Sequence, residues 1–416
     1  MKKLIFLTFL ASSMNIFAID RFVDLNLSIG NGTTLFTTIT SAVTASVNSD
    51  RILIVAGTYN ESTLTINKSL TLLSQTAGSI VNFNGNIIIE GFPGMKLEIL
   101  GFNLGVYSVS SNTIAGGSSA SRAKVSFIDS KMTNLSVDQN YYELNCARST
   151  MTGITTFRYG NFVVSKTSDL FLLDEPSTNL TGKKHLIAGD TVTNRLEIRN
   201  DDYPVTIANS QLKSLFFYKW NNTTLNTNFI RNNQFVIDSY LVFAASAPGY
   251  NLEFSSNEFL STPYFLAAVQ IQCWADGQLG GHYDSYDCST ACNACISFNQ
   301  SSSVFPYPTI PGFFKWTYNG INLPCTIPAG NQPLVLTKII GPIGTNIDAG
   351  NPNHDYYDID LTINDRGRTG GPYSILNYNP SINPSNGKAF VFDIEMPTDL
   401  FPGQQVDIKS KGFHKN

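Results

Sequence analysis

Short apolar runs alternate with polar corners along most of the chain. Residues 50–73, DRILIVAGTYNESTLTINKSLTLL, hold three such runs separated by Gly, Asn and Ser. Brief apolar runs bounded by turn-forming residues indicate buried β-strands. The pattern therefore predicts many short strands, with little room for helix between them.

One helical segment interrupts this pattern near the N-terminus. Leu35, Ile39, Val43 and Val47 recur at every fourth residue, which places them on one face of a helix. A strand is expected soon afterwards, over 52–55. We predict an amphipathic helix over 35–47 that covers the open end of a sheet and protects its edge strand from aggregation.

Between about residues 97 and 265 the unit of strand, polar corner and strand repeats every 19 to 22 residues or so. The predicted corners fall near Ser130, Ser149, Ser168, Asp190, Asn209 and Asn257. Periods of this size indicate a solenoid, whose coils bury their apolar sides by stacking on one another. The corners lack the framework of a leucine-rich repeat, so we predict a parallel β-helix with coils spaced by about 4.8 Å.

Two segments break the repeat. Residues 268–330 are rich in Cys and aromatic residues and predict a long insertion, a feature that often carries a binding face in repeat proteins. Residues 346–372 are acidic and rich in turn-formers, and strand-like runs follow at 390–397 and 404–412. The predicted organisation is a signal peptide at 1–18, a β-helix at 19–372 with the insertion at about 268–330, and a C-terminal β hairpin or cap at 373–416.

Charge and the N-terminal residues indicate where the protein acts. Charged residues make up 14% of the chain and the net charge is -4, which argues against a nucleic-acid partner because such proteins cluster Lys and Arg. MKKLIFLTFLASSMNIFA has the basic start, apolar stretch and small final residue of a secretory signal peptide. No later run reaches the roughly 18 apolar residues of a membrane helix. We expect an exported protein, secreted or at the cell surface, without a transmembrane span.

The cysteines concentrated in the insertion predict disulfide cross-links. In an exported protein these residues are expected to form disulfides, whose pairing the sequence leaves open. The spacing C-x3-C-x2-C at 288–295 also fits an iron–sulfur cluster or a zinc site, although an oxidising compartment favours disulfides. The disulfide candidates are Cys273, Cys288, Cys292, Cys295, Cys325 and Cys146.

The acidic segment is the candidate metal site. Calcium binds about six to eight oxygen ligands, which carboxylates at alternate positions of a turn can supply. The alternative is a hydrogen-bonded turn in which the same side chains cap backbone N–H groups. No cofactor is required, and calcium is the one that the sequence favours. The candidate ligands are Asp348, Asn351, Asp355, Asp358, Asp360 and Asp365.

Binding is better supported than catalysis. Aromatic and His side chains of the insertion could stack on sugar rings or form a patch for a protein partner; the candidates are Trp274, His282, Tyr307 and Trp316. Asn200-Asp201-Asp202 resembles the Asp pairs of β-helix polygalacturonases, but their Gly-His-Gly and Arg-x-Lys signatures are missing. No catalytic residue is therefore assigned.

Two stretches resemble a known class. VDLNLSIGNGTTLFTTITSAVTASVNSDRILIVAGTYNES resembles the opening of secreted right-handed parallel β-helix proteins of the pectate-lyase-like class, including its Gly57-Thr58-Tyr59-x-Glu61. DAGNPNHDYYDIDLTINDRGRTGGP is similar to the closing segment of many such proteins from the Bacteroidetes, with Leu361 where glycine is common. The class includes lyases, hydrolases and adhesins, so the resemblance implies a fold without fixing a function.

The fold expectation is an all-β, right-handed parallel β-helix with an N-terminal capping helix and a short C-terminal β segment. The functional expectation is an exported, non-catalytic scaffold or adhesin-like protein that binds glycan or protein partners at the cell surface. One alternative is a polysaccharide lyase or glycoside hydrolase acting on acidic glycans. Another is a subunit of an outer-membrane or appendage assembly.

Overall fold

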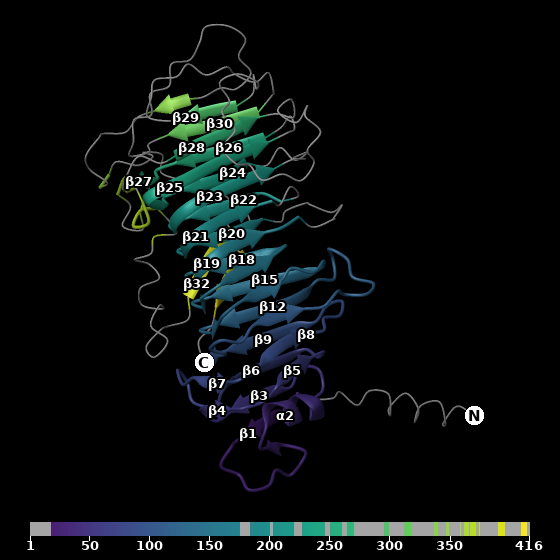
Figure 1. Ribbon diagram of the computed structural model, residues 1–416. Helices are drawn as coiled ribbons and strands as arrows, with labels where there is room; N and C mark the ends of the chain where they lie inside the picture. The colour runs from purple at the N-terminus through teal and green to yellow at the C-terminus, as the bar shows by residue number, and fades with distance from the viewer. Residues whose placement is uncertain are drawn as a thin grey trace, which may run out of the picture.

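The chain winds into a right-handed parallel β-helix, as the sequence predicts (Figure 1). Two sheets that run the length of the stack are built from strands that pair in parallel from coil to coil, except that the last strand of sheet B pairs antiparallel with its neighbour, Cys295 lying opposite Ala268. Residues 1–17 of the expected signal peptide lie outside the described part. The computed structural model describes residues 18–174, 184–199, 203–219, 227–245, 250–259, 264–269, 295–298, 312–317, 337–339, 347–348, 358, 362–365, 367–371, 374, 390–395 and 409–413.

Each of the first regular coils gives one strand to the first sheet, here sheet A, and two short strands to the second, sheet B; in later coils these two strands merge into one. Sheet A contains, in spatial order, β2 (Leu35–Phe36), β1 (Asp20–Val23), β3 (Arg51–Ile54), β6 (Leu70–Ser74), β9 (Lys96–Leu100), β12 (Ala123–Ile128), β15 (Tyr142–Ala147), β18 (Gly160–Val163), β20 (His185–Ala188), β22 (Val205–Ala208), β24 (Thr227–Arg231), β26 (Tyr250–Ser255), β30 (Gly312–Thr317) and β31 (Thr337–Ile339). Sheet B contains β4 (Gly57–Tyr59), β5 (Thr63–Ile66), β7 (Val81–Phe83), β8 (Asn86–Ile89), β10 (Phe102–Asn103), β11 (Val109–Ser111), β13 (Lys131–Met132), β14 (Leu135–Val137), β16 (Thr150–Met151), β17 (Ile154–Phe157), β19 (Lys166–Leu172), β21 (Thr191–Ile198), β23 (Gln211–Lys219), β25 (Gln234–Ala245), β27 (Glu258–Phe259), β28 (Tyr264–Val269) and β29 (Cys295–Phe298). A separate antiparallel pair joins β32 (Phe390–Glu395) to β33 (Lys409–Phe413).

The core lies inside the coils and follows from strict alternation along each strand. In β12, Val125 and Phe127 are fully buried, whereas Lys124 is exposed. Successive strand residues point to opposite faces of a sheet, so alternate apolar positions meet inside the coil. Each fully buried side chain of this size stabilises the fold by about 1.5–3 kcal/mol. The resulting cluster extends from Val23 to Phe235 through the described coils.

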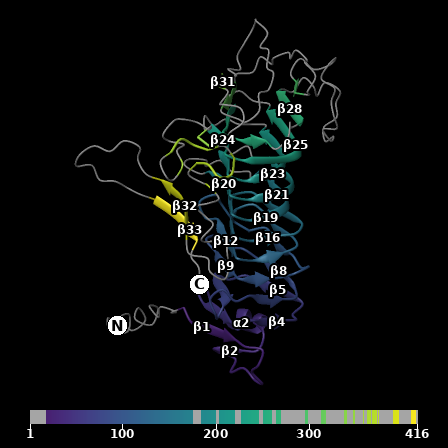
Figure 2. The same ribbon diagram turned by 90° about the vertical axis from the view of Figure 1, so that its left-hand side faces the viewer.

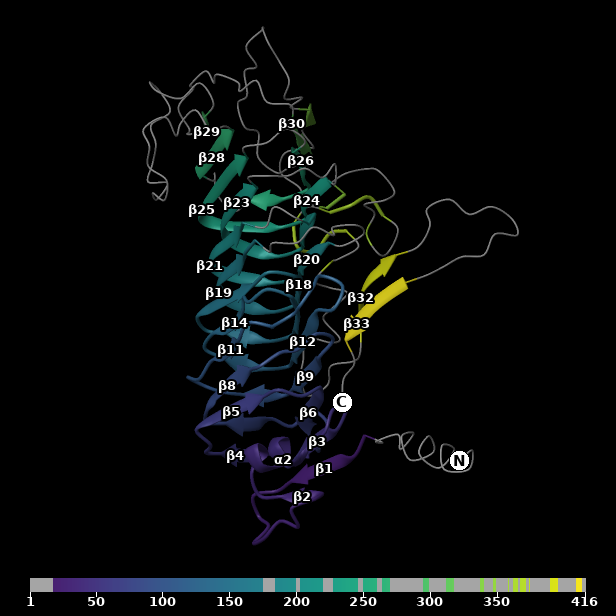
Figure 3. The same cartoon turned by 90° about the vertical axis from the view of Figure 1, so that its right-hand side faces the viewer.

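Helix α2 (Ile39–Ala45) lies at the N-terminal end of the stack (Figure 3). It begins after Thr38, whose side chain accepts the N–H of Ser41, and it buries Ile39, Ala42 and Val43. The helix predicted over 35–47 is therefore too long. Leu35 and Phe36 form β2 instead and pair with β1, because they complete the edge of sheet A.

Charged side chains from the following coil hold both ends of α2. The Glu61 carboxylate accepts the N–H groups of Ile39 at 2.7 Å and Thr40 at 2.8 Å. The Lys68 ammonium donates to the carbonyls of Val43 at 2.9 Å and Thr44 at 2.7 Å. An anion at the N-terminus and a cation at the C-terminus both complement the helix dipole and satisfy groups that the helix itself leaves unpaired.

A left-handed residue marks the corner after many sheet A strands. The φ angles at these positions lie between 48° and 71°, a region that suits Gly and Asn and is uncommon for other residues. Such a residue turns the chain sharply from sheet A into sheet B. The corner residues are Gly101, Asp129, Arg148, Val164, Gly189, Asn209, Asn232 and Ser256.

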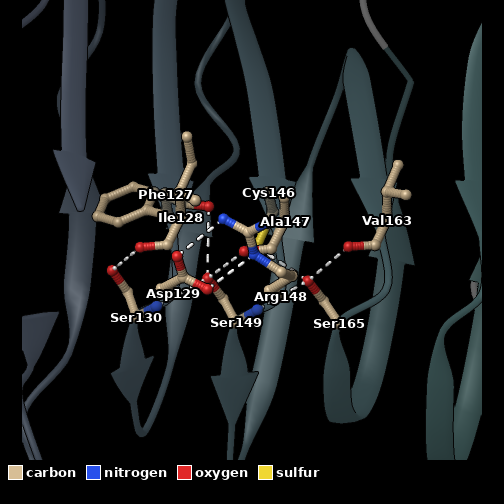
Figure 4. A network of polar contacts seen from close by, with 10 residues as sticks. All are labelled: Phe127, Ile128, Asp129, Ser130, Cys146, Ala147, Arg148, Ser149, Val163 and Ser165. Carbon is tan, nitrogen blue, oxygen red and sulfur yellow. Dashed lines mark hydrogen bonds and ion pairs between the residues drawn. The ribbon is translucent and has the colours of Figure 1, made fainter. Parts of the chain in front are cut away.

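A buried polar ladder follows these corners. The side chain of each ladder residue accepts the backbone N–H of the ladder residue one coil earlier, over 2.6 to 3.1 Å (Figure 4). The ladder thus satisfies buried donors that the turn removes from the sheets. Its members are Ser130, Ser149, Ser165, Asp190, Ser210, Asn233 and Asn257.

The predicted corners agree with this arrangement except in one coil. Ser130, Ser149, Asp190 and Asn257 are ladder residues, and Asn209 is the left-handed residue before one. The prediction at Ser168 is wrong, because Ser168 lies inside β19 and the ladder position is Ser165. The corner moved by three residues because the coil from Ser149 to Ser165 is 16 residues long, whereas the coil from Ser130 to Ser149 is 19 residues long.

An apolar column runs along the outer face of sheet A. Its residues alternate with side chains that point into the coil, yet they are only 0–6% exposed. Something outside the sheet therefore covers them, and Figures 2 and 3 place β32 and β33 beside this face. The column comprises Leu73, Leu100, Ile128, Ala147, Val163 and Ala188.

Candidate functional site

The outer face of sheet B carries a second column, which changes character along the stack. In the first coils it consists mainly of small hydroxyl side chains, and in later coils it becomes aromatic and charged. Parallel pairing keeps equivalent positions in register, so the column is continuous. Its members, in order, are Thr65, Ile88, Ser110, Ser136, Thr156, Phe171, Glu197 and Phe216.

Glu197 is the centre of the charged part. Its side chain is 0% exposed although it occupies an outward-facing position of β21. Arg195 and Arg199 both form ion pairs with its carboxylate, and their own side chains are 35% and 55% exposed. The carboxylate is therefore covered and neutralised, while the two guanidinium groups remain partly accessible.

Aromatic rings complete the cluster. The Arg195 guanidinium carbon lies 4.2 Å from the centre of the Phe216 ring and 5.8 Å from that of Phe171. These are cation–π distances, which stabilise by roughly 0.5–1 kcal/mol at partly exposed sites. Phe171 and Phe216 are themselves half-buried. The site is thus a platform of two rings and two cations around one buried anion, here called the Glu197 cluster.

A bulge in β21 contributes to this arrangement. Between Val192 and Leu196, β21 contains one more residue than β23, and the pairing with β19 shifts in the same region. A bulge bends the strand and redirects its side chains. Asn194 in the bulge donates to Asp169 over 2.7 Å, and Ser168 donates to the other oxygen over 2.8 Å, so Asp169 is held beside Arg195 in the register.

The geometry favours binding over proton transfer by Glu197. A catalytic carboxylate must come within hydrogen-bond reach of the reacting proton. Two ion pairs cover Glu197, so a ligand on this face meets the rings of Phe171 and Phe216 and the edges of the two guanidinium groups first.

A second polar cluster lies where sheet A strands begin. Arg122 donates to the Tyr203 hydroxyl over 2.8 Å, and its guanidinium carbon lies 4.4 Å from the centre of the Tyr159 ring. His185 packs edge-on against both tyrosines, with ring centres 5.2 and 5.3 Å apart. Arg122, His185 and Tyr203 are buried, so this stack joins neighbouring coils and presents no accessible site.

Two of the predicted calcium ligands that the structure describes, Asp358 and Asp365, accept hydrogen bonds from backbone N–H groups. Asp358 accepts the N–H groups of Asp365 and Gly371, and Asp365 accepts the N–H of Asp348 over 2.8 Å. Within the described parts of the chain, no three His, Cys, Asp or Glu side chains form a group that could hold a metal ion. Asn351, Asp355 and Asp360 lie outside those parts, and the calcium site stays a prediction.

The predicted binding residues of the insertion lie outside the described side chains. Trp274, His282 and Tyr307 are not in the described residues, nor are Asp201 and Asp202, and of Trp316 the structure describes only the backbone, in β30.

Cys146 is a free, fully buried thiol, with its sulfur 3.7 Å from the Ser165 hydroxyl. It therefore does not belong with the disulfide candidates. Its strand position, in β15, points it into the coil core. The pairing of the other five cysteines lies outside the described side chains.

Sequence reasoning missed the Glu197 cluster. The signal was present in Arg195-Leu-Glu197-Ile-Arg199, where charged and apolar residues alternate. Alternation in a strand places the three charged side chains on one face. The acidic pair compared with those of polygalacturonases lies at residues 200–202 instead, just beyond the end of β21.

Comparisons with protein-family models, with curated proteins and with solved structures give no match. No helix within the described residues is both long and apolar enough to cross a membrane.

Proposed function

We propose that this chain is an exported, non-catalytic β-helix scaffold of the pectate-lyase-like class, of the Bacteroidetes type, that binds a glycan at the cell surface. The binding face is the outer face of sheet B, centred on the Glu197 cluster. One observation carries the proposal: a column made mainly of hydroxyl side chains runs directly into two half-buried phenylalanine rings flanked by two partly exposed arginines.

The chemistry of a sugar chain fits this face. The rings of Phe171 and Phe216 offer apolar surfaces against which the C–H face of a sugar ring can pack. Arg195 and Arg199 offer donors in a planar, fixed geometry to hydroxyl or carboxylate oxygens. The coil spacing of about 4.8 Å repeats the hydroxyl groups at regular intervals along an extended chain.

Binding to a panel of immobilised uronate-containing and neutral polysaccharides tests the proposal. Phe216→Ala and Arg199→Gln should each weaken binding by about 3- to 10-fold, because each removes one ring or one charged donor. Lys124→Gln, which removes an exposed cation from β12 of sheet A, is the matched control and should bind as the native protein does. Circular dichroism shows whether each variant keeps its fold.

The outcomes separate the alternatives. If both variants bind every polysaccharide like the native protein, the Glu197 cluster is not the binding face, and deletion of 268–330 then tests the insertion. Unsaturated products or new reducing ends in the same incubations would establish a lyase or a hydrolase and overturn the non-catalytic proposal. Absence of binding to any polysaccharide would overturn the proposal of a glycan ligand and would favour a protein partner.

A further inference from the structure

The side chains of the buried ladder both accept and donate hydrogen bonds. Each accepts the backbone N–H of the ladder residue one coil earlier. The serine members also donate through Oγ to the carbonyl of the residue two positions before them, over 3.0 to 3.1 Å. A ladder position therefore requires a side chain that is an acceptor and a donor at once, as hydroxyl and carboxamide groups are.

The asparagine members donate to a carbonyl of the preceding coil. Asn233 Nδ2 donates to the Ile207 carbonyl over 3.0 Å, and Asn257 Nδ2 donates to the Ile230 carbonyl over 2.9 Å. Each of these carbonyls belongs to the residue three positions before the preceding ladder residue, which is Ser210 in the case of Asn233. Each amide thus places Oδ1 on an N–H and Nδ2 on a carbonyl of the same neighbouring coil.

Asp190 stands out in the ladder because an ionised carboxylate has no hydrogen to donate. Its side chain is fully buried, and Oδ1 accepts the Ser165 N–H over 2.6 Å, as the asparagine Oδ1 atoms do in later coils. Oδ2 is buried too, and it makes no hydrogen bond within the described part of the chain. Of the ladder side chains that the structure describes, Asp190 alone leaves a buried polar atom unpaired.

The register of sheet A identifies the carbonyl that corresponds to this oxygen. Phe162 lies in the same row of paired residues as Ile207 and Ile230, whose carbonyls the asparagine amides bind. It also lies three positions before Ser165, whose N–H Asp190 accepts. A carboxyl group has the shape of a carboxamide, so Oδ2 corresponds to the asparagine Nδ2. Two unprotonated oxygens repel each other there, whereas a proton on Oδ2 makes the contact a hydrogen bond.

The surroundings of Asp190 favour the neutral acid. Burial raises the pKa of its carboxyl group well above the ordinary value, because an ionised group loses its hydration inside the protein. Backbone hydrogen bonds involving Ser165 and Ala188, and the positive charge of Arg368, oppose this rise without cancelling it. The direction agrees with what the hydrogen bonds of the ladder require.

The charged groups around Asp190 within the described residues are few. β18 and β22, the strands on either side of β20, contain no charged side chain, and β20 begins with His185 at the opposite end of the strand from Asp190. Cys146 on β15 is a thiol whose pKa is about 12, so it is uncharged at ordinary pH. Arg368 carries a charge that acts on Asp190, but Arg368 Nε and Asp190 Oδ2 both lack a hydrogen-bond partner within the described residues, so these two atoms do not bond to each other.

We propose that Asp190 is held in the folded protein as a neutral carboxylic acid, which takes the place of asparagine in the ladder and makes the coil corner sensitive to pH. Oδ1 accepts the Ser165 N–H, and the Oδ2–H group donates to the Phe162 carbonyl, so one carboxyl group meets both requirements of a ladder position. Folding of this coil takes up one proton wherever the unfolded carboxyl group is ionised. The inference is independent of the glycan-binding face on sheet B.

Urea unfolding of the full-length protein and of Asp190→Asn, between about pH 5 and pH 8, tests the proposal. The folded pKa of Asp190 is raised above its ordinary value of 3.8, so the stability that this group contributes is complete below that value and is lost as the pH rises toward the folded pKa. Asparagine makes the same two hydrogen bonds without a proton. We therefore expect the unfolding equilibrium constant of the native protein, relative to that of Asp190→Asn, to rise by about 10-fold per pH unit.

Two further variants and a spectrum sharpen the test. Asn233→Asp is the reciprocal change and should add a pH dependence of the same sign, because another ladder position then needs a proton. Asp169→Asn, on the outer face of sheet B, is the matched control and should leave the pH dependence as in the native protein. The infrared difference between the native protein and Asp190→Asn at about pH 7 should contain the C=O stretching band of a protonated carboxyl group.

Two results would overturn the proposal. If the ratio of the two unfolding constants is the same at every pH in this range, Asp190 carries the same charge in the folded and the unfolded protein and is an ionised member of the ladder. A carboxylate band in place of the protonated one in the infrared difference would show the same directly. An Asn233→Asp variant whose stability does not depend on pH more than that of the native protein would show that a ladder position needs no donor.

Discussion

Arg148 and Asp129 are joined across neighbouring coils by two hydrogen bonds of 2.8 Å, from Nε to Oδ1 and from Nη2 to Oδ2 (Figure 4). Both residues occupy left-handed corners, with φ of 48° and 52°. The Arg148 side chain is 1% exposed and that of Asp129 is 14% exposed. The pair thus occupies, at the corners after β12 and β15, positions equivalent to those of Asn209 and Asn232, which contact residues 364–370 further along the stack.

Removal of one member of this pair should be costly. Arg148→Met keeps much of the apolar stem but leaves the largely buried Asp129 carboxylate without its guanidinium partner. We therefore expect a loss of about 3 kcal/mol in the free energy of unfolding. Urea unfolding measures it. Asp129→Asn keeps a residue that tolerates the left-handed corner, and the double variant should lose at least about 1 kcal/mol less than the sum of the two single variants. Strict additivity would show that the two side chains do not interact.

The ends of α2 offer a second test. Glu61→Ala leaves the N–H groups of Ile39 and Thr40 without their carboxylate, and we expect a loss of about 1–2 kcal/mol, comparable to the loss of a helix cap. Thermal unfolding and urea unfolding both report it. Glu90→Ala, which removes an exposed glutamate from a later coil, should change stability by no more than about 0.5 kcal/mol. Equal effects of the two substitutions would contradict the capping role of Glu61.

The buried thiol of Cys146 predicts sensitivity to alkali. Burial raises its pKa from 9.0 to about 12, and burial raises the pKa of Tyr59 to about 12 as well. A group whose pKa is higher in the folded state contributes stability that is complete below its unfolded pKa and is lost as the pH rises through its folded pKa. For Cys146 the window is about pH 9 to 12, and the three-unit shift corresponds to about 4 kcal/mol.

Urea midpoints at several values between about pH 8 and pH 10.5 give the slope of stability against pH. Cys146→Ala should flatten this slope relative to the native protein, although it lowers stability at about pH 8 by removing buried volume. A slope that is the same in both proteins would mean that the thiol does not keep its proton in the folded state.

The coils could be predicted from the sequence because the residue pattern that forms each coil lies within one short stretch of chain. Alternation such as that of Val125 and Phe127, and a polar residue at a corner such as Ser149, recur in every unit and need no distant partner. The ends of the helix were predicted less accurately, because Leu35 fits the helical period equally well but forms the edge strand of sheet A. The corner misplaced at Ser168 failed for a similar reason, since serine occurs both in ladders and inside strands.

The contacts of residues 362–371 with the coil corners were not predicted because they join parts of the chain that no local pattern connects. Asn209 and Arg368 are 159 residues apart, and Asn232 and Asn364 are 132 apart. The sequence predicts metal ligands in the acidic segment, whereas backbone groups and the Asn364 side chain make its contacts with the corners. Glu197 was missed because its burial depends on Arg195 and Arg199 folding over it, which alternation alone does not reveal.

The two residues that fix α2 also impose an order of assembly. Ile39 to Thr44 leave the ribosome before Glu61 and Lys68 do, so the helix must wait for about twenty-five further residues before both of its ends are held. A nascent chain ending before Lys68 would expose a seven-residue helix too short to persist alone. The helix and the first coil therefore stabilise each other, because the coil holds both ends of the helix and the helix covers the open end of the coil.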